Sequence, residues 1–260
     1  MSASASGADA TFWIVNWFEG RLAAFDIETT GTETESDRIV TAAVSLVGGG
    51  EESVSKDWLV DPGIPIPAEA TAVHKITDEM VRREGVPAAE AVEQITAILA
   101  EALSEGTPIV AFNGRFDLTI LDREARRHGV MPLVDRVGGS DGLLVVDPYV
   151  LDKQVNRFRK GRRNLSLLCE AFNVPLTDAH AAGADALAAA RLAWRMGNMY
   201  PEIGEADIFE LHEQQIGWAL EQAASLQRYF AEQGRPEPVE GAWPVVPVGA
   251  AVAHEDRLAA

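Results

Sequence analysis

The sequence predicts an α/β fold in which a mixed sheet begins with three antiparallel strands and continues with alternating helices and strands. Three observations predict it: short apolar runs near the start separated only by turns, apolar residues at helical spacing further along, and turn residues between these segments. The chain has 260 residues, of which 47% are hydrophobic and 24% charged. This composition is typical of globular proteins and excludes a wholly disordered chain.

The three antiparallel strands are expected at 22–27, 38–47 and 53–60, because each run is apolar or alternating and a turn follows it. Three consecutive glycines follow the second run, and Asp-Pro-Gly follows the third. Residues 1–18 are expected to be an N-terminal extension. Its first residues, rich in Ser, Ala and Gly, are expected to be disordered, and its aromatic end is expected to pack on the domain.

Helices and short strands are expected to alternate over the next part of the chain. Pro87 and Gly106 bracket the first helix as start and stop residues. Asn113 and Asn164 are expected to cap later helices, whereas Asp147 with the proline after it is read as a turn. The expected helices are 88–104, 116–128, 164–172 and 185–199, and the expected strands are 109–112 and 143–146.

The last sixty residues are expected to form a helical appendage on a domain that spans 19–200. Within 201–260, the apolar spacing predicts a long helix over 205–233. The Pro- and Gly-rich end after it is expected to be extended and loosely held. The appendage is expected to pack on the domain, or to serve a protein partner or self-association.

Charge and cysteine content limit the function classes. The formal net charge is −18, which disfavours non-specific binding to duplex nucleic acid. Residues 153–163 nevertheless hold six basic residues and no acid, so this run is either a solvated face or a phosphate contact. Cys169 is the single cysteine, which excludes an intrachain disulfide. With no secretory signal and no apolar run of roughly 20 residues, we expect a cytoplasmic protein with no membrane partner.

Acidic side chains stand where α/β sheets place their sites, at a strand end and at helix starts. Asp26 and Glu28 leave the first strand on one face, because strand side chains alternate. Asp117 and Asp185 each begin a helix, and His180 lies in the loop before the latter. Each alone has a structural alternative, as a turn cap, a helix N-terminal acid or a solvated loop histidine.

Together these residues point to metal-dependent phosphoryl chemistry. An oxygen-rich ligand set suits Mg²⁺ or Mn²⁺. Two such ions, about 3.5–4 Å apart, would stabilise the attacking and leaving oxygens of an in-line displacement. A histidine beside them can take the proton of a water nucleophile.

Four motifs resemble those of the DEDDh 3′–5′ exonucleases, the family that includes the proofreading epsilon subunit of DNA polymerase III and RNase T-like exonucleases. In order, within residues 20–200, they are FDIETTG, HKITDEMV, VAFNGRFDLTIL and HAAGADALAAA. The resemblance implies an RNase H-like fold, two catalytic divalent cations and release of nucleoside 5′-monophosphates from a 3′ end. By position, it implies that Asp26, Glu28, Asp117 and Asp185 are catalytic metal ligands and that His180 is the general base.

The resemblance also implies substrate contacts, each with an alternative. Thr29, Thr30 and Gly31 would face the terminal nucleotide or form only a tight turn. His74 and Ile76 match a segment that packs around that nucleotide in relatives, although a surface loop histidine fits as well. Further candidates are Phe116, as core or base contact, and the basic-run residues Arg157, Arg159 and Arg162, with Phe158 as a stacking aromatic.

We therefore expect a 3′–5′ exonuclease that acts on nucleic acid 3′ ends, single-stranded or frayed DNA rather than RNA. One alternative is an exoribonuclease that trims RNA or short oligoribonucleotides, since nothing in the motifs reads the 2′-hydroxyl. A more remote alternative is a non-catalytic adaptor with the same fold, whose expected signature is a broken set of acids. Here the set is complete.

Overall fold

The structure is a computed structural model that describes residues 16–177, 179–235 and 238–249. Its centre is a six-stranded mixed sheet in the order β4-β3-β2-β1-β5-β6. The first three strands are antiparallel neighbours, as predicted: β1 is Arg21–Thr29, β2 is Ile39–Gly48 and β3 is Val54–Asp61. Short strands β5 (Ile109–Val110) and β6 (Val145–Val146) extend the sheet in parallel beyond β1, and β4 (Val86–Pro87) pairs with β3.

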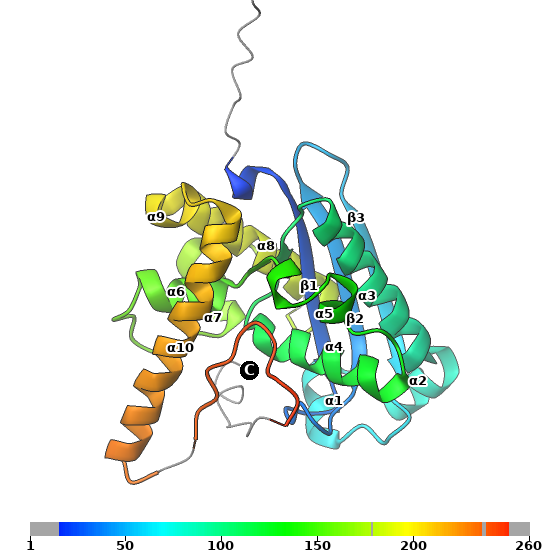
Figure 1. Cartoon of the computed structure of the whole chain (residues 1–260). Helices are drawn as coiled ribbons and strands as arrows, with labels where there is room; N and C mark the ends of the chain where they lie inside the picture. Colours follow the sequence, from blue (N-terminus) through cyan, green and yellow to red (C-terminus); the bar gives the residue numbers. More distant parts are fainter. Residues whose placement is uncertain (1–15, 178, 236–237, 250–260) are drawn as a thin grey trace, which may run out of the picture.

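Helices cover both faces of this sheet (Figure 1). The alternation along β1 divides its side chains, since Phe25 and Ile27 pack into one apolar cluster while Leu22 and Ala24 pack into the other. The first cluster contains helices α3 (Ala88–Ser104), α4 (Gly114–His128) and α5 (Leu133–Arg136). The second contains α6 (Pro148–Val155), α7 (Leu165–Phe172), α8 (Ala182–Met199) and α9 (Pro201–Gly204).

The predicted helix signals are mostly confirmed, with one correction. Asn164 caps α7, its Oδ1 accepting from the N–H of Leu167 at 2.9 Å. The αL backbone of Gly129 ends α4 at the predicted place. Asn113 was expected to cap α4 with its side chain, and this is wrong: its φ is +58° and its side chain makes no capping hydrogen bond.

Several short elements were not predicted, because segments of this length are too short to show a clear hydrophobic periodicity. These are α1 (Ala68–His74), α2 (Asp78–Glu84), β4, α5, α6, α9 and the 3-10 turns at Trp17–Glu19 and Ser140–Gly142. The first turn buries both its aromatic residues, as expected for the end of the N-terminal extension. The expected disorder of the first residues lies outside the described part of the chain.

The last part of the described chain seals one edge of the sheet. Helix α10 (Ile208–Glu232) packs against α6 and β6. The Nδ1 atom of His212 accepts from the N–H of Val145 at 3.1 Å, and Gln215 Nε2 donates to the carbonyl of the same residue at 2.9 Å. These bonds occupy backbone groups of β6 that no further strand pairs. Whether 201–260 forms a unit separate from 19–200 stays a prediction.

The segment after α10 was expected to be loosely held, and for residues 238–249 this is wrong. It returns toward α4 (Figure 1), where Trp243 is 6% exposed and joins the first apolar cluster. The Oγ1 of Thr119 in α4 accepts from the N–H of Val246 at 3.0 Å. Apolar burial and hydrogen bonds to α4 therefore fix a Pro-rich stretch that has no secondary structure. Among the described helices, none has the length and apolar character needed to cross a membrane.

Candidate functional site

The first two acids of the site stand at the end of β1. Asp26 lies opposite Ala43 and Glu28 opposite Thr41 in the β1–β2 register, and the ladder shifts directly after Glu28. Because side chains alternate along a strand, Asp26 and Glu28 lie on the same face of β1 as Ala24, the face that packs against α8. Both are partly exposed, so they are open to a small ligand.

The third acid comes from the first turn of α4. Asp117 is 4% exposed, and its Oδ1 accepts from the backbone N–H of Ile27 at 3.1 Å. Ile27 lies between the two β1 acids in the chain, so this bond holds the helix start against the strand end. The sequence placed Asp117 on a helix start but gave no distance to β1.

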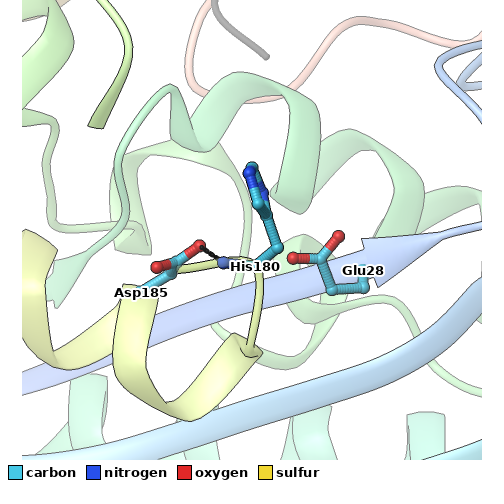
Figure 2. Close-up of side chains that lie close together, drawn as sticks. All are labelled: Glu28, His180 and Asp185. Carbon is cyan, nitrogen blue, oxygen red and sulfur yellow. Dashed lines mark hydrogen bonds between the residues drawn. The ribbon is translucent and has the colours of Figure 1, made fainter. Parts of the chain in front are cut away.

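Asp185 and His180 complete the group from the start of α8. Asp185 Oδ2 accepts from the backbone N–H of His180 at 3.1 Å. The other oxygen, Oδ1, is buried and has no hydrogen-bond partner among the described residues. Figure 2 shows these two residues with Glu28, and their potential ligand atoms all lie within 4.8 Å of one another.

Burial, and then the charge of neighbouring carboxylates, raises the pKa values of the two β1 acids. Burial, then the charges of Asp117, Asp185 and Glu28, raises the pKa of Asp26 well above its ordinary value. Burial, then the charge of Asp185, raises the pKa of Glu28 to about 8. The pKa of Asp185 is also raised, mainly by burial. Negative charge gathered at this density is unfavourable unless protons or a cation compensate for it.

These residues fit a hard divalent cation. They offer several carboxylate oxygens, the ligand type that suits Mg²⁺ and Mn²⁺, with one imidazole beside them. The buried, unpartnered Oδ1 of Asp185 fits the same reading, because a buried polar atom without a partner is costly unless a ligand satisfies it.

The acids open into a cavity of about 440 Å³. Four of the predicted substrate contacts line it: Thr29, Gly31, His74 and Phe116. Thr30 does not line it. Its hydroxyl donates to Asp37 at 2.7 Å, so it shapes the turn after β1. Ile76 packs instead beside the small apolar cluster of Val40, Ile66 and Val81.

His74 is a buried helix-end residue rather than a surface loop histidine. It is 7% exposed at the end of α1, and its Nδ1 accepts from the N–H of Ile76 at 3.1 Å. Burial lowers the pKa of His74, while the nearby Thr29 backbone opposes that shift. Burial therefore favours the neutral form of an imidazole that lies in the wall of the cavity.

The arginines of the basic run fall into two groups, those paired with a buried acid and those exposed to solvent. Arg159 donates from Nε and Nη2 to the fully buried Asp152, at 2.7–3.1 Å, and Arg163 Nε donates to the same carboxylate at 2.9 Å. These two cations hold the loop in place. Arg159, which was expected to contact the substrate, is thus engaged by Asp152 within the protein. Arg157 and Arg162 are exposed, and their expected contact with substrate stays a prediction.

Asp147 was read as a turn residue, but it is a central buried acid. Its carboxylate accepts from the N–H groups of Asn113, Gly114 and Tyr149 at 2.9–3.1 Å. It therefore caps both α6 and the start of α4, the helix that carries Asp117. The signal available in the sequence was Asp followed by Pro, which also marks a helix N-terminus.

Comparison with known proteins gives one family match. The family model described as Exonuclease, RNase T, matches residues 23–193. The DNA polymerase III PolC-type protein of Streptococcus agalactiae is 29% identical over 180 residues, which cover 68% of this chain and 11% of that protein. A DNA polymerase III subunit epsilon-like protein of Rhodobacter capsulatus is 43% identical over 103 residues, 38% of this chain and 14% of that protein. The chain thus matches only a small part of these longer relatives.

Solved structures agree on the fold. The structure of exonuclease I matches with a TM-score of 0.61 at 19% identity, covering 72% of this chain and 42% of that one. Exonuclease I from Methylocaldum szegediense matches at 0.56 and 22% identity, with coverage of 72% and 42%. This likeness confirms the predicted RNase H-like α/β fold.

Proposed function

This chain belongs to the RNase T family of exonucleases, and from that membership we propose that it is a divalent-metal-dependent 3′–5′ exonuclease acting on single-stranded or frayed DNA ends. The observation that carries the proposal is the set of four carboxylates and one histidine around one cavity. They come from segments that are distant in the sequence, the end of β1, the start of α4 and the start of α8.

Asp26, Glu28, Asp117 and Asp185 would hold the cations, two of Mg²⁺ or Mn²⁺. When bound, such ions neutralise charge on the phosphate and on the attacking and leaving oxygens. Without them, burial and neighbouring charge raise the pKa values of Asp26 and Glu28, which favours their protonated forms. The apolar wall formed by Phe116 and the backbone at Gly31 would position the terminal nucleotide.

His180 would act as general base and take the proton of the attacking water. It is exposed, so a water molecule can reach its ring. The hydrogen bond from its backbone to Asp185 keeps the loop beside the cluster. Release of a nucleoside 5′-monophosphate follows when water attacks the last phosphodiester and the 3′-oxygen of the preceding nucleotide leaves.

DNA is the proposed substrate because similar proteins are named as DNA polymerase III proteins and a similar structure was solved with a DNA oligonucleotide. Similar proteins include a DNA polymerase III PolC-type protein and a DNA polymerase III subunit epsilon-like protein, and exonuclease I from E. coli has been solved with a dT13 oligonucleotide. Such a substrate agrees with the cytoplasmic location that the sequence predicts. An RNA substrate is the alternative that the experiment must separate.

The test is a degradation ladder on 5′-labelled and 3′-labelled 12-mers of DNA and RNA, with Mg²⁺ and with EDTA. We expect a one-nucleotide ladder from the 5′-labelled DNA, immediate release of labelled mononucleotide from the 3′-labelled DNA, and no cleavage in EDTA. If the RNA 12-mer is cleaved faster than the DNA 12-mer, the substrate is RNA rather than DNA. Cleavage that persists in EDTA, or that starts at the 5′ end, would contradict the proposal.

A further inference from the structure

A second and larger groove adjoins the acidic cavity. Its volume is about 1130 Å³, against about 440 Å³ for the cavity. One wall consists of α6 and the loop 157–163, and the other is the second half of α10. In Figure 1 these helices run beside each other at one side of the molecule. Because the family match ends at residue 193, the α10 wall belongs to the part of the chain outside it.

The groove is strongly basic on a chain whose net charge is −18. One acid, Glu221, stands among the residues that line it. The basic lining residues are Lys153, Arg157, Arg159, Arg162, Arg163 and Arg228. Such a concentration of cations favours an anionic ligand with several charges.

Three of these arginines are available to a ligand. Arg159 and Arg163 are occupied by Asp152, whereas Arg157, Arg162 and Arg228 form no ion pair with any residue that the structure describes. Two of the three come from the loop and one from α10, so they face the groove from both walls. Guanidinium groups bind phosphate oxygens with paired hydrogen bonds.

Aromatic rings stand between these cations. Tyr149 and Tyr229 both line the groove, the second with 55% of its surface exposed. Phe158, at the loop tip, is 91% exposed. Exposed rings among basic side chains are typical of surfaces that bind single strands, on which bases stack while cations track the backbone.

Two observations place the groove beside the cavity. Gly161, Arg162 and Arg163 line the groove, and the next residues, Asn164 to Ser166, line the cavity. Phe112, in the cavity wall, packs edge-on against Tyr149 with 5.7 Å between ring centroids. A strand whose 3′ nucleotide lies in the cavity can therefore continue into the groove.

We propose that the groove between loop 157–163 and α10 binds the phosphates of the single strand upstream of the terminal nucleotide. This inference rests on the proposed exonuclease function, and it assigns α10 a share in substrate binding. Arg157, Arg162 and Arg228 contact phosphates, while Arg159 and Arg163 are positioning residues that hold the loop on Asp152.

The test measures binding of 5′-fluorescein dT12 to the full chain in EDTA, so that no turnover is needed. The double variant Arg157→Gln/Arg162→Gln is expected to bind at least tenfold more weakly at low salt. The slope of log K against log salt is expected to fall by about 1.4 for the double variant and by about 0.7 for Arg228→Gln, at about 0.7 per phosphate contact. The matched control Arg82→Gln/Arg191→Gln removes the same charge from exposed residues that do not line the groove, and it is expected to retain its slope.

Turnover separates this inference from the proposed function. With Mg²⁺, the groove variants are expected to lose more activity on dT12 than on the dinucleotide pdTpdT, because the longer strand makes more phosphate contacts with the groove. A parent chain that binds dT12 through the groove but cleaves no DNA would overturn the exonuclease proposal and leave the groove assignment in place.

Two results would overturn the groove assignment. The first is an equal loss of affinity in the groove variants and in the control pair. The second is binding of dT12 that the groove variants leave intact while they lose affinity for a deca-glutamate peptide, which would assign the groove to an acidic protein segment.

Discussion

The backbone N–H of His180 donates a hydrogen bond of 3.1 Å to Asp185 Oδ2. The proposed base and a proposed metal ligand are thus joined through main chain rather than through the imidazole ring. His180 adopts φ = +69°, an uncommon backbone conformation for a residue with a side chain. The bond fixes the loop and leaves the ring free to meet water.

Asp185→Asn is expected to abolish hydrolysis of 5′-labelled DNA while it leaves the melting temperature nearly unchanged. The amide oxygen can still accept from His180, but the negative charge that a cation needs is lost. Asp141→Asn, on the exposed turn Ser140–Gly142, is the control and is expected to retain full activity. Retained turnover in Asp185→Asn would remove this carboxylate from the metal site.

His180→Ala is expected to slow turnover by roughly 10²–10⁴-fold, the usual contribution of a positioned general base. Single-turnover rates at saturating DNA and Mg²⁺ give the value, and added imidazole is expected to restore part of it. His128→Ala, at the end of α4, serves as the control. A loss smaller than tenfold in His180→Ala would count against the assignment of the base.

Without metal, the protein is expected to lose stability as the pH rises from 5 to 8. The folded state raises the pKa of Glu28 from 4.5 to about 8, so the folded protein binds this proton more tightly than the unfolded chain does. The free energy of unfolding therefore falls across that pH range. Urea titrations in EDTA at pH 5, 6.5 and 8 measure it.

Mg²⁺ is expected to remove much of this pH dependence, because the cation binds the deprotonated carboxylates and so stabilises the folded protein most at high pH. At 100 times its Kd, a ligand adds about 2.7 kcal/mol to the free energy of unfolding. Glu28→Gln is expected to flatten the metal-free slope between pH 6.5 and 8. A free energy of unfolding in EDTA that rises between pH 5 and 8 would contradict the raised pKa of Glu28.

Asp147→Asn is expected to lower the free energy of unfolding by about 2 kcal/mol or more. The carboxylate accepts from three backbone N–H groups and from Trp243 Nε1, whereas an amide keeps only one acceptor oxygen, and an unsatisfied buried donor costs about 1–3 kcal/mol. Activity is expected to fall as well, because the start of α4 carries Asp117. Urea denaturation and DNA cleavage, with Asp141→Asn as reference, measure both effects.

The sequence predicted the sheet and the position of the acids because both follow from local patterns. Period-two alternation in β1 places Asp26 and Glu28 on one face, and helix start signals place Asp117 and Asp185 in first turns. The four acids come together only because of the strand order in the sheet. Local patterns do not give that order, and it was expected only from the family resemblance.

Contacts between distant segments were beyond the sequence. Nothing local shows that Asp147 holds the start of α4 or that Arg159 turns inward to Asp152, because each acid meets its partners only after folding. The Pro-rich segment at 238–249 was misjudged for the same reason. Composition predicts a loose tail, whereas Trp243 is buried in the first apolar cluster and its Nε1 donates to Asp147, 96 residues earlier in the chain.

The pairing of α10 with β6 has a consequence for how this protein behaves when it is shortened. A chain cut back to the family boundary would lose His212 and Gln215, and the amide and carbonyl of Val145 would then stand open at a bare sheet margin. Such a margin recruits strands from other molecules. The long terminal helix therefore also serves as protection against self-assembly into aggregates.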